Sequence, residues 1–198
     1  MITFKSKTDV HSTEDIFAEI NARMIAALMF HSQMADYFDF LGFRGYKRIH
    51  EYQYFDESKE RRCLNRYYIN HHNQIIPDRY DGVVQMIPDG WKTANRMSVG
   101  KSTKQKAVED GFLQYREWES MTKELYEKYA VELRTGGMIA DAIYVDGLVE
   151  DVDKELKCLE RIMVDLISTG YDMTYIVESQ KDIHDKYRDK LKEVEKYA

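Results

Sequence analysis

The chain has 198 residues, a formal net charge of −6 and 32% charged residues, which suits one domain with a buried core. The negative charge argues against a nucleic-acid-binding surface. The N-terminus lacks the apolar segment of a signal peptide, and no stretch approaches about 18 apolar residues, so we expect neither export nor membrane insertion. Cys63 and Cys158 lack zinc-site spacing and are expected to be buried thiols in a reducing cytoplasm.

The first predicted helix begins after Ser12 and ends near Leu41. Ser12 followed by Asp15 is typical of an approximate capping box. Apolar residues then recur at three- and four-residue spacing as far as Phe38, which predicts one wide apolar face. His31 lies on that face, where a histidine is more often a hydrogen-bonded core residue than a metal ligand.

The second predicted helix runs from about residue 45 to residue 70 and carries two acids on its apolar face. Glu57 and Glu60 are three residues apart, so they share a face and together offer oxygen ligands for one cation. They also fall within the charged sequence DESKERR, which is typical of a solvent-exposed face. If both point inward without a metal, a nearby basic residue such as Arg61 must neutralise them. We interpret His50 as a surface residue.

Residues 73 to 103 lose the helical pattern and hold both prolines and three glycines, so they predict a long connection. Such a connection has a reason in a four-helix bundle, where joining two parallel neighbours means crossing the whole bundle. Two more helices are predicted, from about 104 to 134 and from about 138 to 169, and glycines follow both. The two short connections and the long one favour an up-down-down-up order.

The C-terminal tail predicts a fifth, more polar helix with a narrow apolar stripe. The expected fold class is therefore all-α, and we expect the whole chain to form a single domain. In that domain residues 12–170 form a four-helix bundle with a long crossover between its second and third helices, and residues 171–198 form the C-terminal helix.

The sequence MADYFDFLGFRGYKR resembles the turn between the first two helices of bacterial ferritins, and the match needs no gap. It covers Met34, Tyr37, Phe38, Asp39, Gly42, Gly45 and Tyr46. Continued without gaps, the segment DESKE falls where ferritins carry their EExxH metal motif. The order of the elements stays similar over about residues 13 to 185. The resemblance implies a ferritin-like four-helix bundle.

The resemblance also implies a metal centre of inward-facing carboxylates, for which iron is the expected metal. This sequence departs from the ferritin pattern at several positions. The first-helix glutamate falls on Met24, which cannot bridge two hard cations. Glu57 keeps the leading glutamate of the second helix, whereas Glu60 stands in the histidine position. His31 replaces a ferritin tyrosine, and its imidazole offers a substitute for the ligand lost at Met24.

The third-helix glutamate of ferritins falls near Tyr115 or, one turn later, on Glu119. The fourth-helix acid falls on Asp151 or Glu155, which are four residues apart and are expected to point the same way. Each of these three acids, taken alone, is more often a surface residue. The candidate metal ligands are therefore His31, Glu57, Glu60, Glu119, Asp151 and Glu155.

These residues lead to two main hypotheses of function. The first is a divergent ferritin-like protein that binds iron or another divalent metal weakly, with weak or absent ferroxidase activity because of Met24. The alternative is a metal-free scaffold or interaction protein with the same fold, without a cofactor. An oxygen-activating enzyme with a rearranged di-metal centre ranks last, because no substrate pocket can be read from the sequence. We expect a cytoplasmic homo-oligomer whose partners are metal ions and not nucleic acid or membranes.

Overall fold

The computed structural model of the chain describes residues 11–77 and 96–194. Within these ranges the chain forms helices and no strand, so the all-α prediction is confirmed. The helices are α1 (Thr13–Leu41), α2 (Arg44–His72), η2 (Arg96–Ser98), α3 (Lys101–Thr135), α4 (Ile139–Ser168) and α5 (Met173–Val194). No helix within the described ranges is both long and apolar enough to span a membrane.

Local sequence signals set both ends of α1. The Ser12 hydroxyl accepts a hydrogen bond from the Asp15 backbone at 3.1 Å, and the Asp15 carboxylate accepts one from the Ser12 backbone at 3.2 Å. This is the predicted capping box, and it satisfies backbone donors that the helix leaves free. At the other end Gly42 adopts a φ of 87°, a left-handed conformation that glycine reaches without steric cost. The chain reverses there, and α2 begins two residues later.

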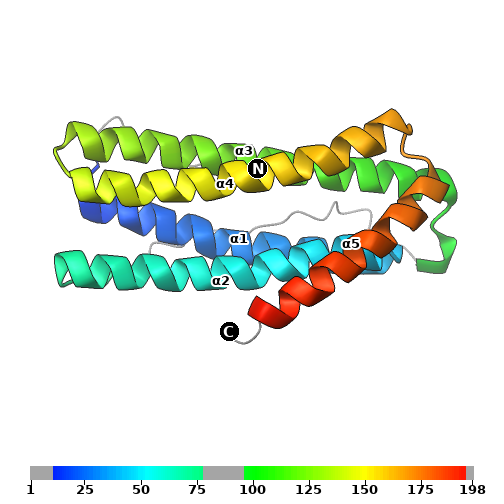
Figure 1. Cartoon of the computed structure of the whole chain (residues 1–198), viewed down its shortest axis with the longest axis horizontal. Coiled ribbons are helices and arrows are strands. Elements are labelled where there is room, and N and C mark those ends of the chain that lie inside the picture. The colour runs from blue at the N-terminus through cyan, green and yellow to red at the C-terminus, as the bar shows by residue number, and fades with distance from the viewer. Residues whose placement is uncertain (1–10, 78–95, 195–198) are drawn as a thin grey trace.

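The four long helices lie alongside one another, and α5 crosses them diagonally near one end (Figure 1). Helix α1 packs against α2 and α3, α3 packs against α4, and α5 packs against α2. The α1–α2 turn and the start of α3 lie at one end of the molecule, and the α3–α4 turn lies at the other end. Helices α2 and α3 therefore run in the same direction. Residues 78–95, most of the predicted connection between them, lie outside the described residues.

Two apolar clusters fill the space between the helices. The cluster near the α1–α2 turn, here the turn-end cluster, centres on Phe30, Phe38, Tyr46 and Phe112. The cluster toward the opposite end, here the far-end cluster, includes Ile16, Phe17, Met24, Leu64, Tyr68 and Tyr129. Tyrosine and methionine side chains thus contribute to the core, as their spacing predicts. Polar side chains occupy the level between the two clusters.

Helix α5 is docked through a close backbone approach at Gly45. A Cβ atom at this position would lie 2.1 Å from the carbonyl oxygen of Gln180, so only glycine fits. The tail also contributes Ile176 and Tyr187 to the turn-end cluster. The Tyr46 hydroxyl adds a hydrogen bond to Ser179 Oγ at 3.3 Å. The predicted fifth helix therefore packs on its own chain.

The expectation that the two cysteines are buried is wrong. Cys63 and Cys158 are both exposed. In each case the following residue takes the inward position, because Leu64 and Leu159 are buried in the two apolar clusters. Neighbouring positions on a helix differ by about 100° in direction, so only one of each pair faces the core.

Candidate metal centre

The level between the apolar clusters is occupied by charged and polar side chains from all four long helices. They are Arg23 and His31 from α1, Glu57 and Glu60 from α2, Glu119 from α3, and Glu155 from α4. Arg23, His31 and Glu119 are at most 2% exposed. The other three glutamates are partly exposed. We refer to this group of six as the polar centre.

Two buried imidazoles contact each other at the edge of the polar centre. His31 Nδ1 lies 3.0 Å from His50 Nδ1, and neither ring is more than 1% exposed. Burial, with a smaller contribution from Arg23, lowers the pKa of His31 to about 3. Burial, followed by the neighbouring His31, likewise holds the pKa of His50 well below its ordinary value. Both rings are therefore neutral at pH 7, and one donates the hydrogen bond that the other accepts.

The interpretation of His50 as a surface residue is wrong. His50 and Glu51 are adjacent on α2, so their side chains point in different directions, and His50 is the one that points inward. Glu51 takes the outward direction and forms ion pairs with Lys47 and Arg48. His50 lies one turn before Gln53, which is on the inward face of α2. This spacing could have identified His50 as a buried residue.

Two fully buried atoms of the polar centre face each other without a hydrogen bond. His31 Nε2 and Glu119 Oε1 are 3.6 Å apart, which is longer than a hydrogen bond between these atoms. Neither atom has a hydrogen-bond partner among the described residues. When His31 Nδ1–H donates to His50, Nε2 carries a free lone pair. Buried polar atoms without partners are uncommon and call for a bound ion, a water molecule or a functional reason.

Arg23 brings a positive charge into the same region. Its Nε donates to Thr122 Oγ1 at 2.8 Å, and an Nη donates to the backbone oxygen of Trp118 at 2.7 Å. The guanidinium carbon lies 3.4 Å above the Trp118 ring. Arg23 is thus a buried cation of the centre, whereas Arg61 Nε donates to Asn21. The sequence interpretation missed Arg23, although it lies three residues after buried Ile20 on the apolar face of α1.

The four glutamates of the polar centre hold their protons more tightly than free carboxyl groups. Burial is the largest cause, and repulsion among the carboxyls adds to it for Glu57, Glu60 and Glu155. The pKa of Glu119 is raised to about 7 and that of Glu60 to about 8. The pKa values of Glu57 and Glu155 lie well above the ordinary range. The charge of Arg23 lowers the pKa of Glu119 and partly offsets its burial.

Asp151 lies at the rim of this arrangement. Its side chain is exposed and accepts a hydrogen bond from Lys154 at 2.7 Å. Glu155, one turn later, is less exposed and interacts electrostatically with Glu57, Glu60 and Glu119. Of the two α4 acids that the sequence left open, Glu155 is therefore the one that joins the centre.

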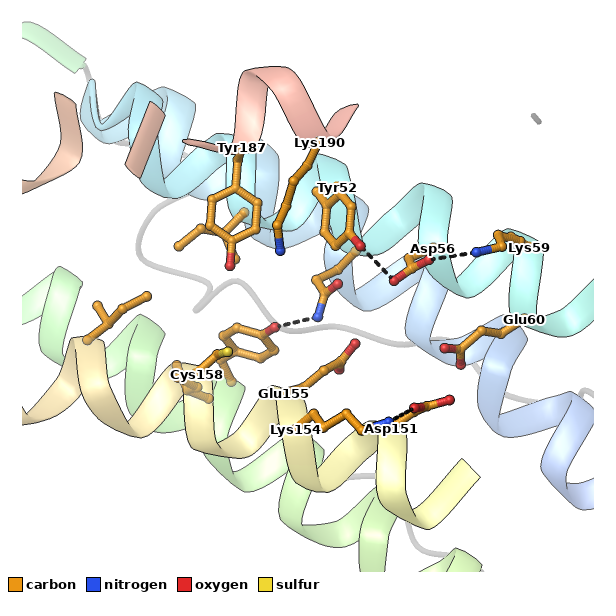
Figure 2. Close-up of a pocket in the computed structure, with 15 residues that line it drawn as sticks. Tyr52, Asp56, Lys59, Glu60, Asp151, Lys154, Glu155, Cys158, Tyr187 and Lys190 are labelled. Carbon is orange, nitrogen blue, oxygen red and sulfur yellow. Dashed lines mark hydrogen bonds and ion pairs between the residues drawn. The ribbon is translucent and has the colours of Figure 1, made fainter. Parts of the chain in front are cut away.

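A solvent-accessible pocket of about 410 Å³ adjoins the polar centre. It lies between α2, α4 and α5, and its lining includes Gln53, Glu60, Tyr115 and Glu155 (Figure 2). Two of the four central glutamates are therefore reachable from solvent. His31 and His50 line a separate pocket, of about 370 Å³.

The side chains only partly fit a metal ion as they stand. Among the described residues, no three His, Cys, Asp or Glu side chains are arranged so that they could hold a metal. His31 Nε2 and Glu119 Oε1 supply two donors, and their 3.6 Å separation is compatible with an ion about 2.1 Å from each. A third donor requires a carboxylate to change its rotamer, and Glu57 is electrostatically coupled to Glu119. Imidazole with carboxylates suits Fe(II), Mn(II) or Zn(II).

Met24 contributes no ligand to this set. It is fully buried in the far-end cluster, and its thioether is a soft donor that hard divalent ions disfavour. No protein-family model matches the chain, and no curated protein matches it either.

Proposed function

We propose that the protein is a divergent ferritin-like protein that binds a single divalent metal ion, iron or another, weakly in the polar centre. The observation that carries this proposal is the pair of buried, unpartnered atoms His31 Nε2 and Glu119 Oε1, 3.6 Å apart. An ion between them satisfies both atoms at once. Glu57 is the third ligand in this proposal, with Glu60 and Glu155 nearby.

The proposed architecture is an up-down-down-up four-helix bundle with a long crossover between α2 and α3. Two observations support it: α1 pairs with α2 and α3 with α4 through short turns, and α2 and α3 share a direction. The resemblance of the Met34–Tyr46 turn to bacterial ferritins supports the family. Homo-oligomerisation and a cytoplasmic location stay predictions.

The chain's own residues determine the strength of binding. In the tautomer pair in which His31 Nδ1–H donates to His50 Nδ1, His31 Nε2 is free to act as a ligand, and the proposal uses this pair. Glu119 must release its proton, because only the carboxylate binds a cation well. The nearby guanidinium of Arg23 helps that release, yet it also repels an incoming cation. A bound ion would supply Lewis acidity and, if it is iron, redox capacity.

Ferroxidase activity is expected to be weak or absent. A di-iron centre needs bridging carboxylates from the bundle helices. Near the polar centre α1 contributes no carboxylate. Met24 is a poor ligand for hard ions, and Arg23 repels cations. The remaining donors suffice for one ion at most.

The alternative is a metal-free scaffold, and one observation favours it. Arg23 already places a buried positive charge among the glutamates, which is how a protein neutralises inward acids without a metal. In that case, neutral carboxyl groups and Arg23 together keep the centre near charge balance. Metal affinity decides between the two functions.

Equilibrium dialysis of the full chain against Fe(II) under anaerobic conditions, at pH 8 and about 100 μM metal, tests the proposal. We expect about one ion per chain, and less than about 0.2 in Glu119→Gln, which removes a ligand but keeps its shape. Asp151→Asn is the matched control, because it removes an exposed acid from the rim, and it should bind like the parent. Equal binding by Glu119→Gln and the parent, or less than about 0.2 ion in the parent, would favour the scaffold.

A further inference from the structure

The pocket beside the polar centre combines aromatic walls with acidic groups. Tyr52 from α2 and Tyr187 from α5 lie on one side, and Glu155 from α4 lies across from them (Figure 2). Leu159 and Ile162 add apolar surface. A pocket of about 410 Å³ with this lining suits a small organic molecule that has both hydrocarbon and charge.

Lys190 places a positive charge next to the two tyrosine rings of the pocket. Its Nζ lies 5.0 Å from the ring centre of Tyr52 and 5.1 Å from that of Tyr187. These are cation–π distances. No ion pair joins Lys190 to an acid among the described residues, so the two rings are its main charge-stabilising partners there. An alkylammonium group is thus already accommodated at the mouth of the pocket.

Gln53, which lines the same pocket, has an unused acceptor. The residue is 6% exposed and lines the pocket wall. Its Nε2 donates to the Tyr115 hydroxyl at 3.0 Å, which orients the amide. Its Oε1 is buried and has no hydrogen-bond partner among the described residues. An acceptor left in this state requires a donor from a molecule that enters the pocket.

The acids of the pocket fall into two groups. Asp56 and Asp151 are paired with Lys59 and Lys154. Glu60 and Glu155 form no ion pair with any described residue, and Glu155 receives only a hydrogen bond from the Gln53 amide. The unpaired acids therefore line the same pocket as Gln53. Together they complement a group that carries both positive charge and several N–H donors.

We propose that this pocket binds a primary alkylammonium compound, whose N–H groups donate to Gln53 Oε1 and to an oxygen of the Glu155 carboxyl group. Its hydrocarbon part lies against Tyr52 and the apolar side chains of α4. Lys190 competes with this ligand for the aromatic rings. A bare metal ion would leave the apolar and aromatic walls uncontacted, whereas an alkylammonium ion contacts walls and acceptors together. The proposal does not depend on metal binding at His31 and Glu119.

Calorimetric titration of the full chain with hexylammonium, in the presence of a metal chelator, tests the proposal. The neutral 1-hexanol and the anionic hexanoate have the same hydrocarbon chain and serve as comparison ligands. We expect hexylammonium to bind at least about tenfold more tightly than either, because it alone donates charge-assisted hydrogen bonds to Gln53 and Glu155. Equal affinity for hexylammonium and 1-hexanol would overturn the proposal. Metal binding is absent under these conditions, so the result is separate from that of the metal proposal.

Two variants locate the binding site. Glu155→Gln keeps the side-chain shape and should weaken hexylammonium binding about tenfold, whereas Lys190→Met removes the competing cation and should strengthen it about threefold. Glu160→Gln, an exposed acid on the same helix, is the matched control and should bind like the parent. Circular dichroism of each variant verifies that the helices are retained. Unchanged affinity in both Glu155→Gln and Lys190→Met would contradict the proposed site.

Discussion

The turn-end cluster and the polar centre are adjacent regions built from the same helices, yet they differ in how completely their groups are satisfied. At the turn end, Phe38 packs against Tyr46 and Phe112 with ring centres 5.5 and 5.7 Å away. The Tyr37 hydroxyl there donates to the Ala107 carbonyl at 3.1 Å. In the polar centre, by contrast, the pKa values of the carboxyl groups are raised. His31 and Glu119 each have a buried polar atom without a hydrogen-bond partner among the described residues. The first region stabilises the fold, and in our proposal the second gives up stability for a binding site.

The largest effect should come from Phe38→Ala. The side chain is fully buried in the turn-end cluster, so its removal leaves a cavity, and the free energy of unfolding should fall by about 4 kcal/mol. Urea denaturation measures this change. Leu113→Ala is the control, because Leu113 is 44% exposed and its loss should cost less than about 1 kcal/mol. Similar losses in the two variants would show that the turn end is not a tightly packed core.

Gly45→Val should detach α5. The added Cβ would lie 2.1 Å from the backbone oxygen of Gln180, which cannot move aside as a flexible side chain would. We expect a loss of about 2 kcal/mol or more and faster amide hydrogen exchange throughout α5. Gly147→Ala provides a contrast of opposite sign, because open space surrounds Gly147 within α4 and alanine should stabilise the helix by roughly 0.5 to 1 kcal/mol. Normal protection of α5 in Gly45→Val would refute the close docking.

Glu119→Gln should have the opposite effect to the turn-end substitutions and stabilise the metal-free protein. The folded-state pKa of Glu119 is raised from 4.5 to about 7, so its favourable contribution is complete below about pH 4.5 and is lost as the pH rises through 7. At pH 8 the variant should be more stable by on the order of 3 kcal/mol, and near pH 4 the two proteins should be equally stable. Denaturation with chelator across this pH range measures the difference. A gain that is the same at pH 4 and pH 8 would contradict the assigned titration.

The smallest expected effect concerns Arg23→Met, which keeps most of the side-chain length but removes its charge. Divalent metal ions should bind about tenfold more tightly, because the repelling guanidinium is gone. Dialysis against Co(II) measures the affinity, and circular dichroism confirms that the helices are intact. Weaker metal binding in Arg23→Met would mean that Arg23 supports the site and does not compete with the ion.

The helices could be predicted from the sequence because their signals are local. The capping box at Ser12, the glycine at position 42 and the three- and four-residue apolar spacing all act within one helix or turn. The docking of α5 could not be predicted, because the contact between Gly45 and Gln180 joins residues 135 positions apart. Nothing near either residue in the sequence indicates its partner.

The polar centre could be predicted only in part, because a helix face is easier to infer than the direction of one side chain. The resemblance to ferritins identified Glu57, Glu60 and Glu119 as candidates for the centre. It did not decide between Asp151 and Glu155 for the acid of the fourth helix. Their four-residue spacing puts both on one side of the helix, and only packing determines which one points inward. His50 and Arg23 were missed because charged and polar residues are usually exposed, and their burial depends on partners from other helices.

The central claim is that His31 Nε2 and Glu119 Oε1 are a ready pair of ligands for one divalent ion. Anomalous diffraction from crystals soaked in Co(II) tests it most directly. We predict one anomalous peak between these two atoms in the parent protein, retained in Asp151→Asn and lost in Glu119→Gln. A parent crystal with no peak there, or with Co(II) only at surface carboxylates, would contradict the account.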